Sequence, residues 1–200
     1  MRCNKPNNIS KSEFDMIPDD VYVQKTVEGD AEAFNELVNR HHSKIYGLAY
    51  RMLGNREDAA DATQETFLEA YKSIKAFRFQ SQFGTWLYRI GINTCQQHIR
   101  KSQSHDHKVT AYTREAEING IASDEDSPER ATLKDEQNEM VQSAINWLPP
   151  KQREVVTLYY MQHLKYREIA EVLNCSEGTV ASRLNQALKN LKRKLSKYYL

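Results

Sequence analysis

Two helical patterns separated by a three-residue turn lie near the end of the chain and strongly constrain its fold. The patterns Tyr166–Leu173 and Glu177–Leu184 flank the turn Asn174–Ser176, which is the spacing of a helix-turn-helix. Asn174 can adopt the left-handed conformation that ends a helix, and Ser176 is a favourable N-cap for the next one. The chain is therefore expected to fold around a helix-turn-helix that binds double-stranded DNA.

The second helix of this motif separates packing positions from exposed ones. Val180 and Leu184 are expected to face inward, with Ala170 small where the two helices approach. Available to the major groove are then Thr179, Ala181, Ser182, Asn185 and Gln186, with Arg183 available to bases or backbone. The segment from residue 178 to 200 has six basic residues and no acidic one, as contact with phosphates requires. Helix packing alone could explain the apolar positions, but the whole pattern favours DNA binding.

A second basic region, Ala70–His105, has six fixed positive charges, a run of aromatic residues and no acid. Positive grooves attract phosphates, and aromatic rings offer faces on which unpaired bases stack. Phe77–Thr85 lacks apolar periodicity and is expected to be a loop, with a helix starting at Trp86. One face of this helix holds Arg89, Asn93, Gln96 and Arg100, and the opposite face holds Leu87, Tyr88, Gly91, Ile92, Cys95 and Ile99. The stretch predicts a nucleic-acid surface, and a solvated amphipathic helix is the alternative.

The helix predicted from Glu57 to about Ala76 carries two different stripes. One stripe, expected to face a core, holds Phe67, Tyr71 and Ile74, with Ala60 a turn or two earlier. The other is acidic and holds Asp58, Asp61, Glu65 and Glu69. Like charges at this spacing repel by a few tenths of a kcal/mol per pair, and solvated faces usually mix signs. The acidic stripe is interpreted as a docking surface for a basic partner, with a solvated helix face as the alternative.

The net charge of +1 hides a strong asymmetry along the chain. Residues 102–139 carry −6, whereas residues 140–200 carry +6. Residues 102–127 have few large apolar side chains and contain the cluster Asp124-Glu125-Asp126, a composition typical of a linker. Basic regions separated by an acidic block indicate two nucleic-acid surfaces and a spacer.

The cysteines are too few and too scattered for a disulfide framework, since they lie at positions 3, 95 and 175. Cys95 and His98 could begin a metal site, but Cys95 is on the apolar face, which favours a buried free thiol. The sequence has no signal peptide, no apolar run long enough to span a membrane and no phosphate-binding glycine loop. We expect a reduced, cytoplasmic protein without a cofactor, and not an enzyme.

Further helical patterns fill most of the chain, and no alternating β-type run is present. The patterns are Val21–Val27, Ala31 to about Leu53, Ala131–Trp147 and Lys151–Gln162. The predicted fold is all-α, with two small helical domains joined by a flexible acidic linker. The predicted boundaries are 1–18 for a tail, 19–101 for the first domain, 102–127 for the linker and 128–200 for the second domain.

Three motifs, in this order, resemble the extracytoplasmic-function (group 4) sigma factors of bacterial RNA polymerase. Asp58-Ala-Ala-Asp-Ala-Thr-Gln-Glu-Thr-Phe67 is similar to region 2.2 of that family. Phe77–Ile90 followed by Asn93 is similar to regions 2.3 and 2.4. Leu148-Pro149, Arg153, Glu168-Ile-Ala170 and Gly178-Thr-Val-x-Ser-Arg-Leu184 are similar to region 4. The resemblance covers about residues 20–195.

The resemblance implies three contact surfaces and a set of partners. For docking on the β′ clamp of core polymerase it implies Asp58, Asp61, Gln64, Glu65 and Glu69. For melting and reading the −10 element it implies Phe77, Phe79, Gln80, Ser81, Phe83, Trp86, Arg89, Asn93 and Arg100, with an unpaired base held by Phe77, Phe83 and Asn93. For reading the −35 element it implies Ser176, Gly178, Thr179, Ala181, Ser182, Arg183, Asn185, Gln186 and Lys189. The implied partners are core RNA polymerase (β′ and β subunits), promoter DNA and an anti-sigma factor, with no small-molecule substrate.

Several positions depart from the family pattern. Ala60 replaces a frequent Glu, and by the helical count it faces the core, so docking should survive. Phe79 stands where the family usually has Gly, and a positive backbone angle there is costly for Phe. Gln97 replaces a frequent Asp, and Ala181, Asn185, Gln186 and Leu188 stand where many relatives carry basic or bulky groups. These departures bear on promoter choice.

Two other functions explain parts of the sequence. A free-standing helix-turn-helix regulator accounts for residues 166–195 but leaves the aromatic loop and the acidic stripe without a role. A module for single-stranded nucleic acid accounts for residues 70–105 but not for the helix-turn-helix. Co-purification with core polymerase separates a promoter-specificity subunit from the free-standing regulator.

Overall fold

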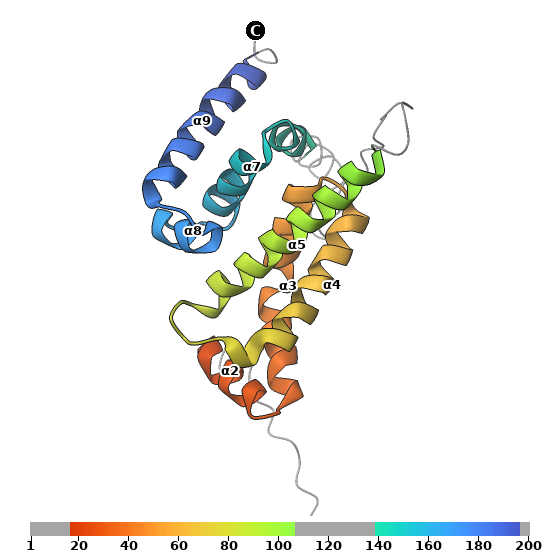
Figure 1. Cartoon of the computed structure of the whole chain (residues 1–200), viewed down its shortest axis with the longest axis vertical. Helices are drawn as coiled ribbons and strands as arrows, with labels where there is room; N and C mark the ends of the chain where they lie inside the picture. The colour runs from red at the N-terminus through yellow and green to blue at the C-terminus, as the bar shows by residue number, and fades with distance from the viewer. Residues whose placement is uncertain (1–16, 107–138, 197–200) are drawn as a thin grey trace, which may run out of the picture.

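The computed structural model describes residues 17–106 and 139–196, and within these ranges every regular element is helical (Figure 1). The N-terminal part contains α2 (Asp19–Val27), α3 (Ala31–Leu53), α4 (Arg56–Ser73) with a 3₁₀ turn η1 (Ile74–Ala76), and α5 (Phe83–Asp106). The C-terminal part contains a helical segment at 139–146, α7 (Pro150–Val156), η2 (Thr157–Met161), α8 (Tyr166–Leu173) and α9 (Glu177–Leu195). The expected all-α fold is confirmed for the part of the chain that the structure describes.

Local capping signals fix where α3 and α4 begin and end. The Asp30 side chain accepts a hydrogen bond from the Ala33 amide at 3.2 Å, and Asn55 accepts one from the Asp58 amide at 2.8 Å. Gly54 ends α3 with φ of 85°, a left-handed angle that suits glycine. These caps pair amides that a helix start leaves without a partner. The helix starts are therefore fixed by Asp30 and Asn55, and the sharp turn between α3 and α4 by Gly54.

Helix α2 is held on α3 by a partly buried network of polar and charged side chains. Asp19 pairs with His41 at 2.7 Å and with Arg40 at 3.2 Å. Arg40 also donates to the Ile17 carbonyl at 2.6 Å and lies over the Tyr22 ring. The hydrogen bond from His41 holds the pKa of the Asp19 carboxyl below its ordinary value, against the opposing effect of burial. The start of the first domain is therefore fixed close to the aromatic loop.

Small residues form the inner face of α4, and this corrects part of the sequence-based prediction. Its buried positions are Ala59, Ala62, Thr63, Thr66, Phe67 and Ala70. Tyr71 is 50% exposed and Ala60 is also exposed, although both were expected to face the core. Neighbouring helices pack closely against α4, and small residues such as alanine and threonine allow this close approach. The buried face of α4 is therefore rotated relative to the face that the large apolar residues predicted.

The helix-turn-helix has the predicted geometry. Asn174 ends α8 with φ of 48°, and the Ser176 side chain accepts a hydrogen bond from the Thr179 amide at 3.1 Å. Val180 and Leu184 are buried, and Ala170 is 9% exposed. The helix predicted over Lys151–Gln162 is observed as two consecutive elements: α7 is α-helical, and η2, which follows it without a break, is π-helical.

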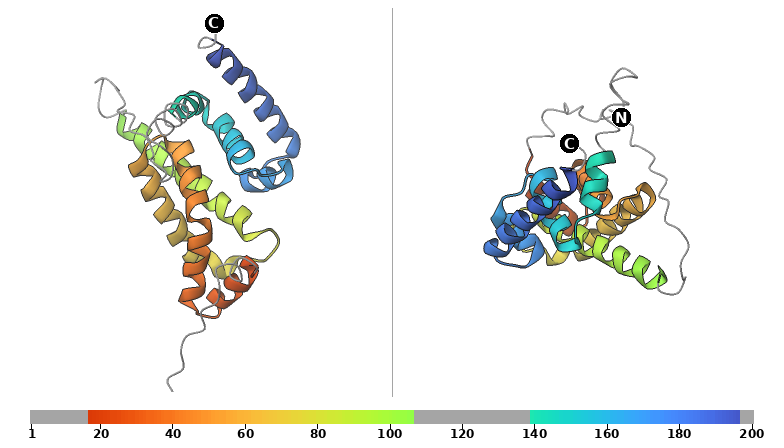
Figure 2. Two further views of the ribbon diagram at one scale, coloured as in Figure 1. Left: turned by 180° about the vertical axis from the view of Figure 1, so that it is seen from behind. Right: turned by 90° about the horizontal axis from the view of Figure 1, so that it is seen from above.

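The C-terminal helices lie against one side of the α2–α5 bundle (Figures 1 and 2). Helix α5 contacts α8, and α3 contacts both α7 and η2. Buried apolar side chains from both parts form one continuous cluster. The predicted linker lies largely outside the described residues, although α5 continues to Asp106, five residues beyond the boundary expected at 101. Among the described helices, none is long and apolar enough to cross a membrane.

Candidate DNA and polymerase interfaces

The exposed face of α9 presents the residues predicted to read duplex DNA. Val180, Leu184 and Ala187 are buried on the inner face. The exposed positions are Ser176, Gly178, Ser182, Asn185, Gln186 and Lys189, and the partly exposed ones are Thr179, Ala181 and Arg183. The structure therefore places all nine predicted residues at the accessible start and outer face of one helix, which is the surface a helix-turn-helix presents to a major groove.

The basic end of α9 is partly engaged by Trp147, a residue that sequence reasoning did not single out. The Arg193 guanidinium lies 5.7 Å and the Lys194 amine 5.8 Å from the centre of the Trp147 ring. Cation–π contacts of this kind hold a charge in place. Lys189 and Lys192 are exposed on the same helix. The end of α9 thus remains suited to phosphate contact, but two of its charges are oriented by Trp147, in the turn between the helical segment at 139–146 and α7.

The aromatic loop is organised around a packed cluster rather than an open platform. Phe83 is 1% and Phe77 7% exposed. Their ring centres are 6.1 Å apart, and Trp86 lies 5.3 Å from Phe77 and 5.6 Å from Phe83. His41 closes the far side of Phe83 at 5.4 Å. Phe77 and Phe83, expected to hold an unpaired base, therefore support the loop from within, because neither offers an open ring face in this conformation.

Phe79 is the exposed aromatic residue of this loop. Its side chain is 47% exposed, and its ring centre lies 5.0 Å from that of Phe77. Its φ is 55°, the left-handed region that costs a non-glycine residue about 1–3 kcal/mol. The loop keeps the conformation that suits glycine although phenylalanine occupies the position. The fold thus tolerates a conformational free-energy cost at Phe79, in a backbone conformation that leaves the Phe79 ring exposed to solvent.

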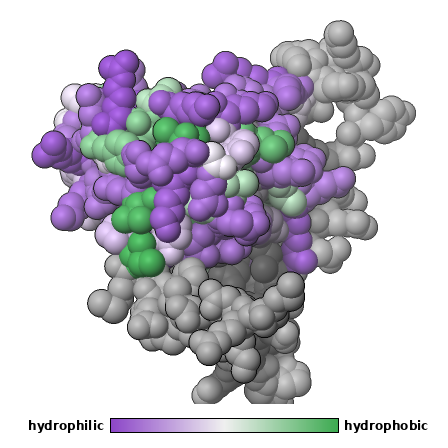
Figure 3. Space-filling model, turned by 90° about the horizontal axis from the view of Figure 1, so that it is seen from below, coloured by the Kyte–Doolittle hydropathy of each residue, from purple (hydrophilic) through white to green (hydrophobic). Residues whose placement is uncertain are grey.

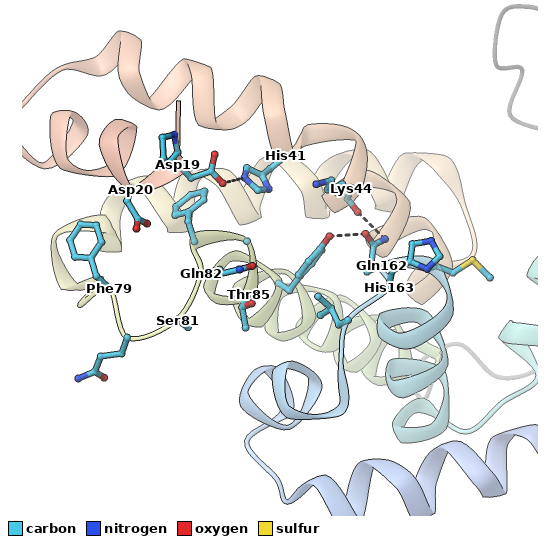
Figure 4. A pocket seen from close by; sticks show the side chains of 17 residues that line it. Asp19, Asp20, His41, Lys44, Phe79, Ser81, Gln82, Thr85, Gln162 and His163 are labelled. Carbon is cyan, nitrogen blue, oxygen red and sulfur yellow. Dashed lines mark hydrogen bonds and ion pairs between the residues drawn. The ribbon is translucent and has the colours of Figure 1, made fainter. Parts of the chain in front are cut away.

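A cavity of about 750 Å³ lies beside the loop, between α2, α3 and residues 161–164 (Figure 4). Asp19, Asp20 and Lys44 supply charged groups to its wall, and His41, Ser81, Gln82 and Thr85 supply polar ones. In Figure 4 Phe79 lies on the loop at one end, whereas Gln162 and His163 close the other end. The cavity therefore has walls from both parts of the chain.

The predicted −10 face of α5 is polar, and part of it is occupied by the C-terminal part. Asn93 and Arg100 are exposed. Arg89 donates to the Glu171 carbonyl, and Gln96 donates to Glu154 at 2.8 Å. The opposite face packs as expected, with Leu87, Tyr88, Ile92 and Cys95 buried. The interpretation of α5 as an amphipathic helix is thus confirmed, although α5 begins at Phe83 and not at Trp86 as expected. Its polar face is not wholly free.

The acidic stripe lies on the outer side of α4, with Asp61, Gln64, Glu65 and Glu69 exposed and Asp58 partly exposed. Glu65 pairs with His98 of α5 at 3.0 Å, and Glu69 lies 4.0 Å from Lys72. The remaining charge points outward, which concentrates negative potential along one helix.

An apolar groove of about 550 Å³ adjoins this stripe between α3 and α4, and the sequence-based site did not include it. Its lining includes Val38, Tyr46, Phe67, Leu68 and Tyr71, together with Gln64 of the stripe. Leu68 and Tyr71 are each about half exposed. The face of the molecule seen from below in Figure 3 is mainly hydrophilic, with apolar residues in small separate groups. A docking partner for α4 can therefore combine positive charge with apolar contact.

Comparison with known proteins decides the family. Residues 37–105 match Sigma-70 region 2, and residues 138–191 match Sigma-70, region 4. The ECF RNA polymerase sigma-E factor of Haemophilus influenzae is 34% identical over 184 residues, covering 90% of this chain and 97% of that relative. The ECF sigma factor SigW of Bacillus subtilis is 37% identical over 182 residues, covering 86% of this chain and 94% of that relative. The chain belongs to the extracytoplasmic-function sigma factors.

This ECF sigma factor is a non-catalytic subunit that directs RNA polymerase to promoters through regions 2 and 4. Its fold is that of the sigma factor RpoE of Bartonella quintana, solved in complex with the anti-sigma factor NepR. The two share 20% identity at a TM-score of 0.69, over 83% of this chain and 98% of that one. The family and the function predicted from sequence motifs are confirmed. The assignment of individual residues to promoter or polymerase stays a prediction.

Among the described residues, no group of three or more His, Cys, Asp or Glu side chains could hold an ion. Cys95 is a buried free thiol, as expected, and burial raises its pKa to about 12. Cys95 therefore belongs to the packing of region 2.

Proposed function

We propose that three separate surfaces of this sigma factor bind the −35 element, the −10 element and core polymerase. The outer face of α9 reads the −35 element as duplex DNA. The loop at residues 77–82 and the polar face of α5 read the melted −10 element, and the outer face of α4 docks on core polymerase. The exposure of the outer faces of α9 and α4 and of the Phe79 ring, away from the residues that form the core, is the observation that supports this division.

For the −10 element, Phe79 takes the stacking role and Phe77 with Phe83 supports it. Phe79 is the ring open to solvent, and its neighbour Phe77 is packed on Phe83 and Trp86. An unpaired base can stack on an exposed ring, whereas entry between buried rings would require the core to open. Gln80, Ser81 and Asn93 then supply polar contacts near the base, and Arg89 and Arg100 contact phosphates.

For docking, the acidic residues of α4 and the adjacent groove bind the β′ clamp of core polymerase together. Asp61 and Glu65 attract a basic surface, while Leu68 and Tyr71 bury apolar area beside it. Charge sets the rate and orientation of association, and apolar burial in the groove supplies affinity. The groove is continuous with the acidic stripe through Gln64, which supports a single partner for both.

This assignment places the protein in the cytoplasm with the polymerase and promoter DNA. An anti-sigma factor is a further expected partner, because the fold is shared with a sigma factor that was solved with one. Promoter choice is expected to reflect Ala181, Asn185 and Gln186, which are exposed or partly exposed where many relatives carry basic or bulky groups.

Run-off transcription tests the proposal directly. Core polymerase with the purified sigma factor should transcribe a defined subset of a genomic fragment library, and core enzyme alone should not. Co-purification of the chain with core polymerase is expected in parallel. Specific duplex binding and regulation without any association with core polymerase would instead favour a free-standing regulator.

A further inference from the structure

The loop that carries Phe79 ends on one side chain of α3. The His41 ring centre lies 5.4 Å from that of Phe83 in an edge-to-face contact, and a side chain at Gly84 would come within 3.4 Å of His41 Cε1. Phe83 and Gly84 are the first residues of α5, directly after the loop at residues 77–82. His41 is itself 7% exposed. The end of the loop therefore rests on the imidazole ring of His41.

Helix α2 fixes the orientation of that ring. Asp19 Oδ2 accepts a hydrogen bond from His41 Nε2 at 2.7 Å (Figure 4). A carboxylate only accepts hydrogen bonds, so Nε2 is the ring nitrogen that carries the proton. Arg40 Nη1 holds the other carboxylate oxygen, Asp19 Oδ1, at 3.2 Å and also donates to the Ile17 carbonyl. Consecutive residues of α3 thus engage both oxygens, which keeps the carboxylate from rotating away from His41.

Helix α2 also supports the start of the loop. It precedes residues 37–105, which match Sigma-70 region 2, yet it contacts η1, the 3₁₀ turn that leads into the loop. Val23 of α2 and Phe77 at the start of the loop belong to the same buried apolar cluster. Helix α2 therefore supports the loop at both ends, directly at η1 and through His41 at Phe83.

This support reaches the exposed ring through packed aromatic contacts. The ring centre of Phe83 lies 6.1 Å from that of Phe77, and the ring centre of Phe77 lies 5.0 Å from that of Phe79. Phe83 and Phe77 are buried, so neither ring can shift unless a neighbour also moves. Phe79 has a positive φ of 55°, a conformation that persists only where the surrounding structure holds it. The position of the Phe79 ring therefore depends on contacts that begin at Asp19.

We propose that Asp19 and His41 are positioning residues for the −10 loop, which hold the Phe79 ring where an unpaired base can stack on it. The inference rests on the stacking role proposed for Phe79. Neither residue needs to touch DNA, because Asp19 acts through His41, and His41 acts through Phe83. Polymerase docking and −35 reading are assigned to α4 and α9, so they should not depend on this pair.

The full chain with Asp19→Ala, assembled with core polymerase, tests the positioning role. Permanganate reactivity of unpaired thymines measures promoter opening, and titrations measure closed-complex formation and core affinity. Glu36→Ala is the matched control, because Glu36 is another carboxylate paired with Arg40, at 3.2 Å, and its side chain is 26% exposed against 27% for Asp19. The control removes one acid and one partner of Arg40 but leaves the bond between Asp19 and His41. Thermal unfolding followed by circular dichroism verifies that each variant is folded.

Asp19→Ala should lower promoter opening about threefold or more, since part of a base–aromatic stacking contact is lost. Core affinity and closed-complex formation should match the wild type. Asp19→Asn should retain most of the opening, because its amide oxygen accepts the same hydrogen bond from His41. His41→Gln keeps a donor but removes the ring that touches Phe83, so it should lose opening as Asp19→Ala does. Glu36→Ala should open promoters as the wild type does.

A double-mutant cycle separates positioning of the ring from general support of region 2. If Asp19 acts through the Phe79 ring, Asp19→Ala should cause no further loss of opening in a Phe79→Ala protein. An equal loss in both backgrounds would overturn the proposal, because the pair would then only stabilise region 2. So would normal opening by Asp19→Ala when Phe79→Ala is defective, a result that leaves the stacking role intact. Normal opening by Phe79→Ala would instead disprove the stacking role, and the positioning role would fall with it.

Discussion

The exposed ring of Phe79 is held out by a backbone angle that glycine would adopt at no cost. Base–aromatic stacking contributes about 1–3 kcal/mol per base, so Phe79→Ala in holoenzyme should lower open-complex formation about fivefold or more. Promoter binding by the closed, unmelted complex should change little, because the ring meets a base only after melting. Permanganate reactivity of unpaired thymines measures the opening directly.

Two substitutions separate stacking from stability. Phe79→Gly should lose opening to the same extent yet stabilise the fold by about 1 kcal/mol, since it relieves the positive φ of 55°. Phe83→Ala should destabilise region 2 by about 3–5 kcal/mol, because its side chain is 1% exposed. Normal opening by Phe79→Ala would refute the stacking role.

The thiol of Cys95 makes a second residue-scale prediction. Burial raises its pKa to about 12 from an ordinary value of 9.0, and the thiolate is the reactive form. In the native protein at pH 8, Cys95 should resist alkylation and should react rapidly once the chain is unfolded. Since the unfolded thiol ionises first, its contribution to stability is present below pH 9 and falls as the pH rises above it. Peptide mapping of iodoacetamide adducts with and without denaturant measures the alkylation of Cys95. Fast labelling of Cys95 in the native protein would contradict the prediction.

At the scale of elements, the acidic stripe of α4 should determine affinity for core polymerase. Asp61→Lys with Glu65→Lys reverses two outward charges, and core affinity should fall about tenfold or more, because each reversal replaces attraction with repulsion. Helicity should be retained, since neither side chain is buried. Titration of labelled sigma factor with core enzyme, at low and high salt, measures the loss and its screening.

The matched control reverses two exposed acids elsewhere, Glu28→Lys with Glu32→Lys, which changes net charge equally but lies off the stripe. His98→Ala tests whether the hydrogen bond between Glu65 and His98 of α5 contributes separately. Equal loss of affinity in the control would mean that overall charge, not the stripe, attracts the polymerase.

Local signals explain which elements were predictable. Asn174 and Ser176 define the turn of the helix-turn-helix by conformations that each residue favours on its own, so the bounds of α8 and the start of α9 were expected correctly, whereas α9 continues from Leu184 to Leu195. Tyr71 was misplaced because periodicity in large apolar residues outweighed the alanines that α4 buries. The exposure of Phe79 and the burial of Phe83 depend on how a loop folds over α3, and sequence spacing contains no such information. The contacts of Gln162 with Tyr88 and Lys44 join residues far apart in the chain, so sequence spacing could not predict them either.

At the scale of the whole molecule, limited proteolysis should cut first within residues 107–127, beyond the end of α5. The residues there have a linker composition. The two fragments should stay associated on gel filtration, because regions 2 and 4 share a continuous apolar cluster and the hydrogen bonds of Gln142 and Gln162. Mass spectrometry identifies the cut sites. A first cut inside α3 or α9 would contradict the two-domain organisation.

Weak DNA binding by the isolated protein is the other whole-molecule expectation. Residues 107–127 carry a net charge of −3, including Asp124, Glu125 and Asp126. Acids tethered near a basic helix compete with phosphates for the same cations. The −10 surface cannot contribute on duplex DNA, where bases are paired. We expect core polymerase to change these conditions by spacing the two regions and capturing the melted strand.

Specific promoter binding near physiological salt should therefore require core enzyme, while deletion of residues 107–127 should raise the nonspecific duplex affinity of the isolated protein. Replacing Asp124, Glu125 and Asp126 by Asn, Gln and Asn keeps the length and removes only charge. At low salt this variant should show most of the increase in nonspecific duplex affinity that the deletion shows. At about 0.5 M salt the increase should disappear, because screening shortens the range of electrostatic interactions to a few ångströms. Gel-shift titrations of wild type, both variants and holoenzyme on one promoter compare these affinities. If the isolated wild type bound that promoter tightly and specifically, α9 alone would suffice for recognition, and the acidic segment would have no competitive role.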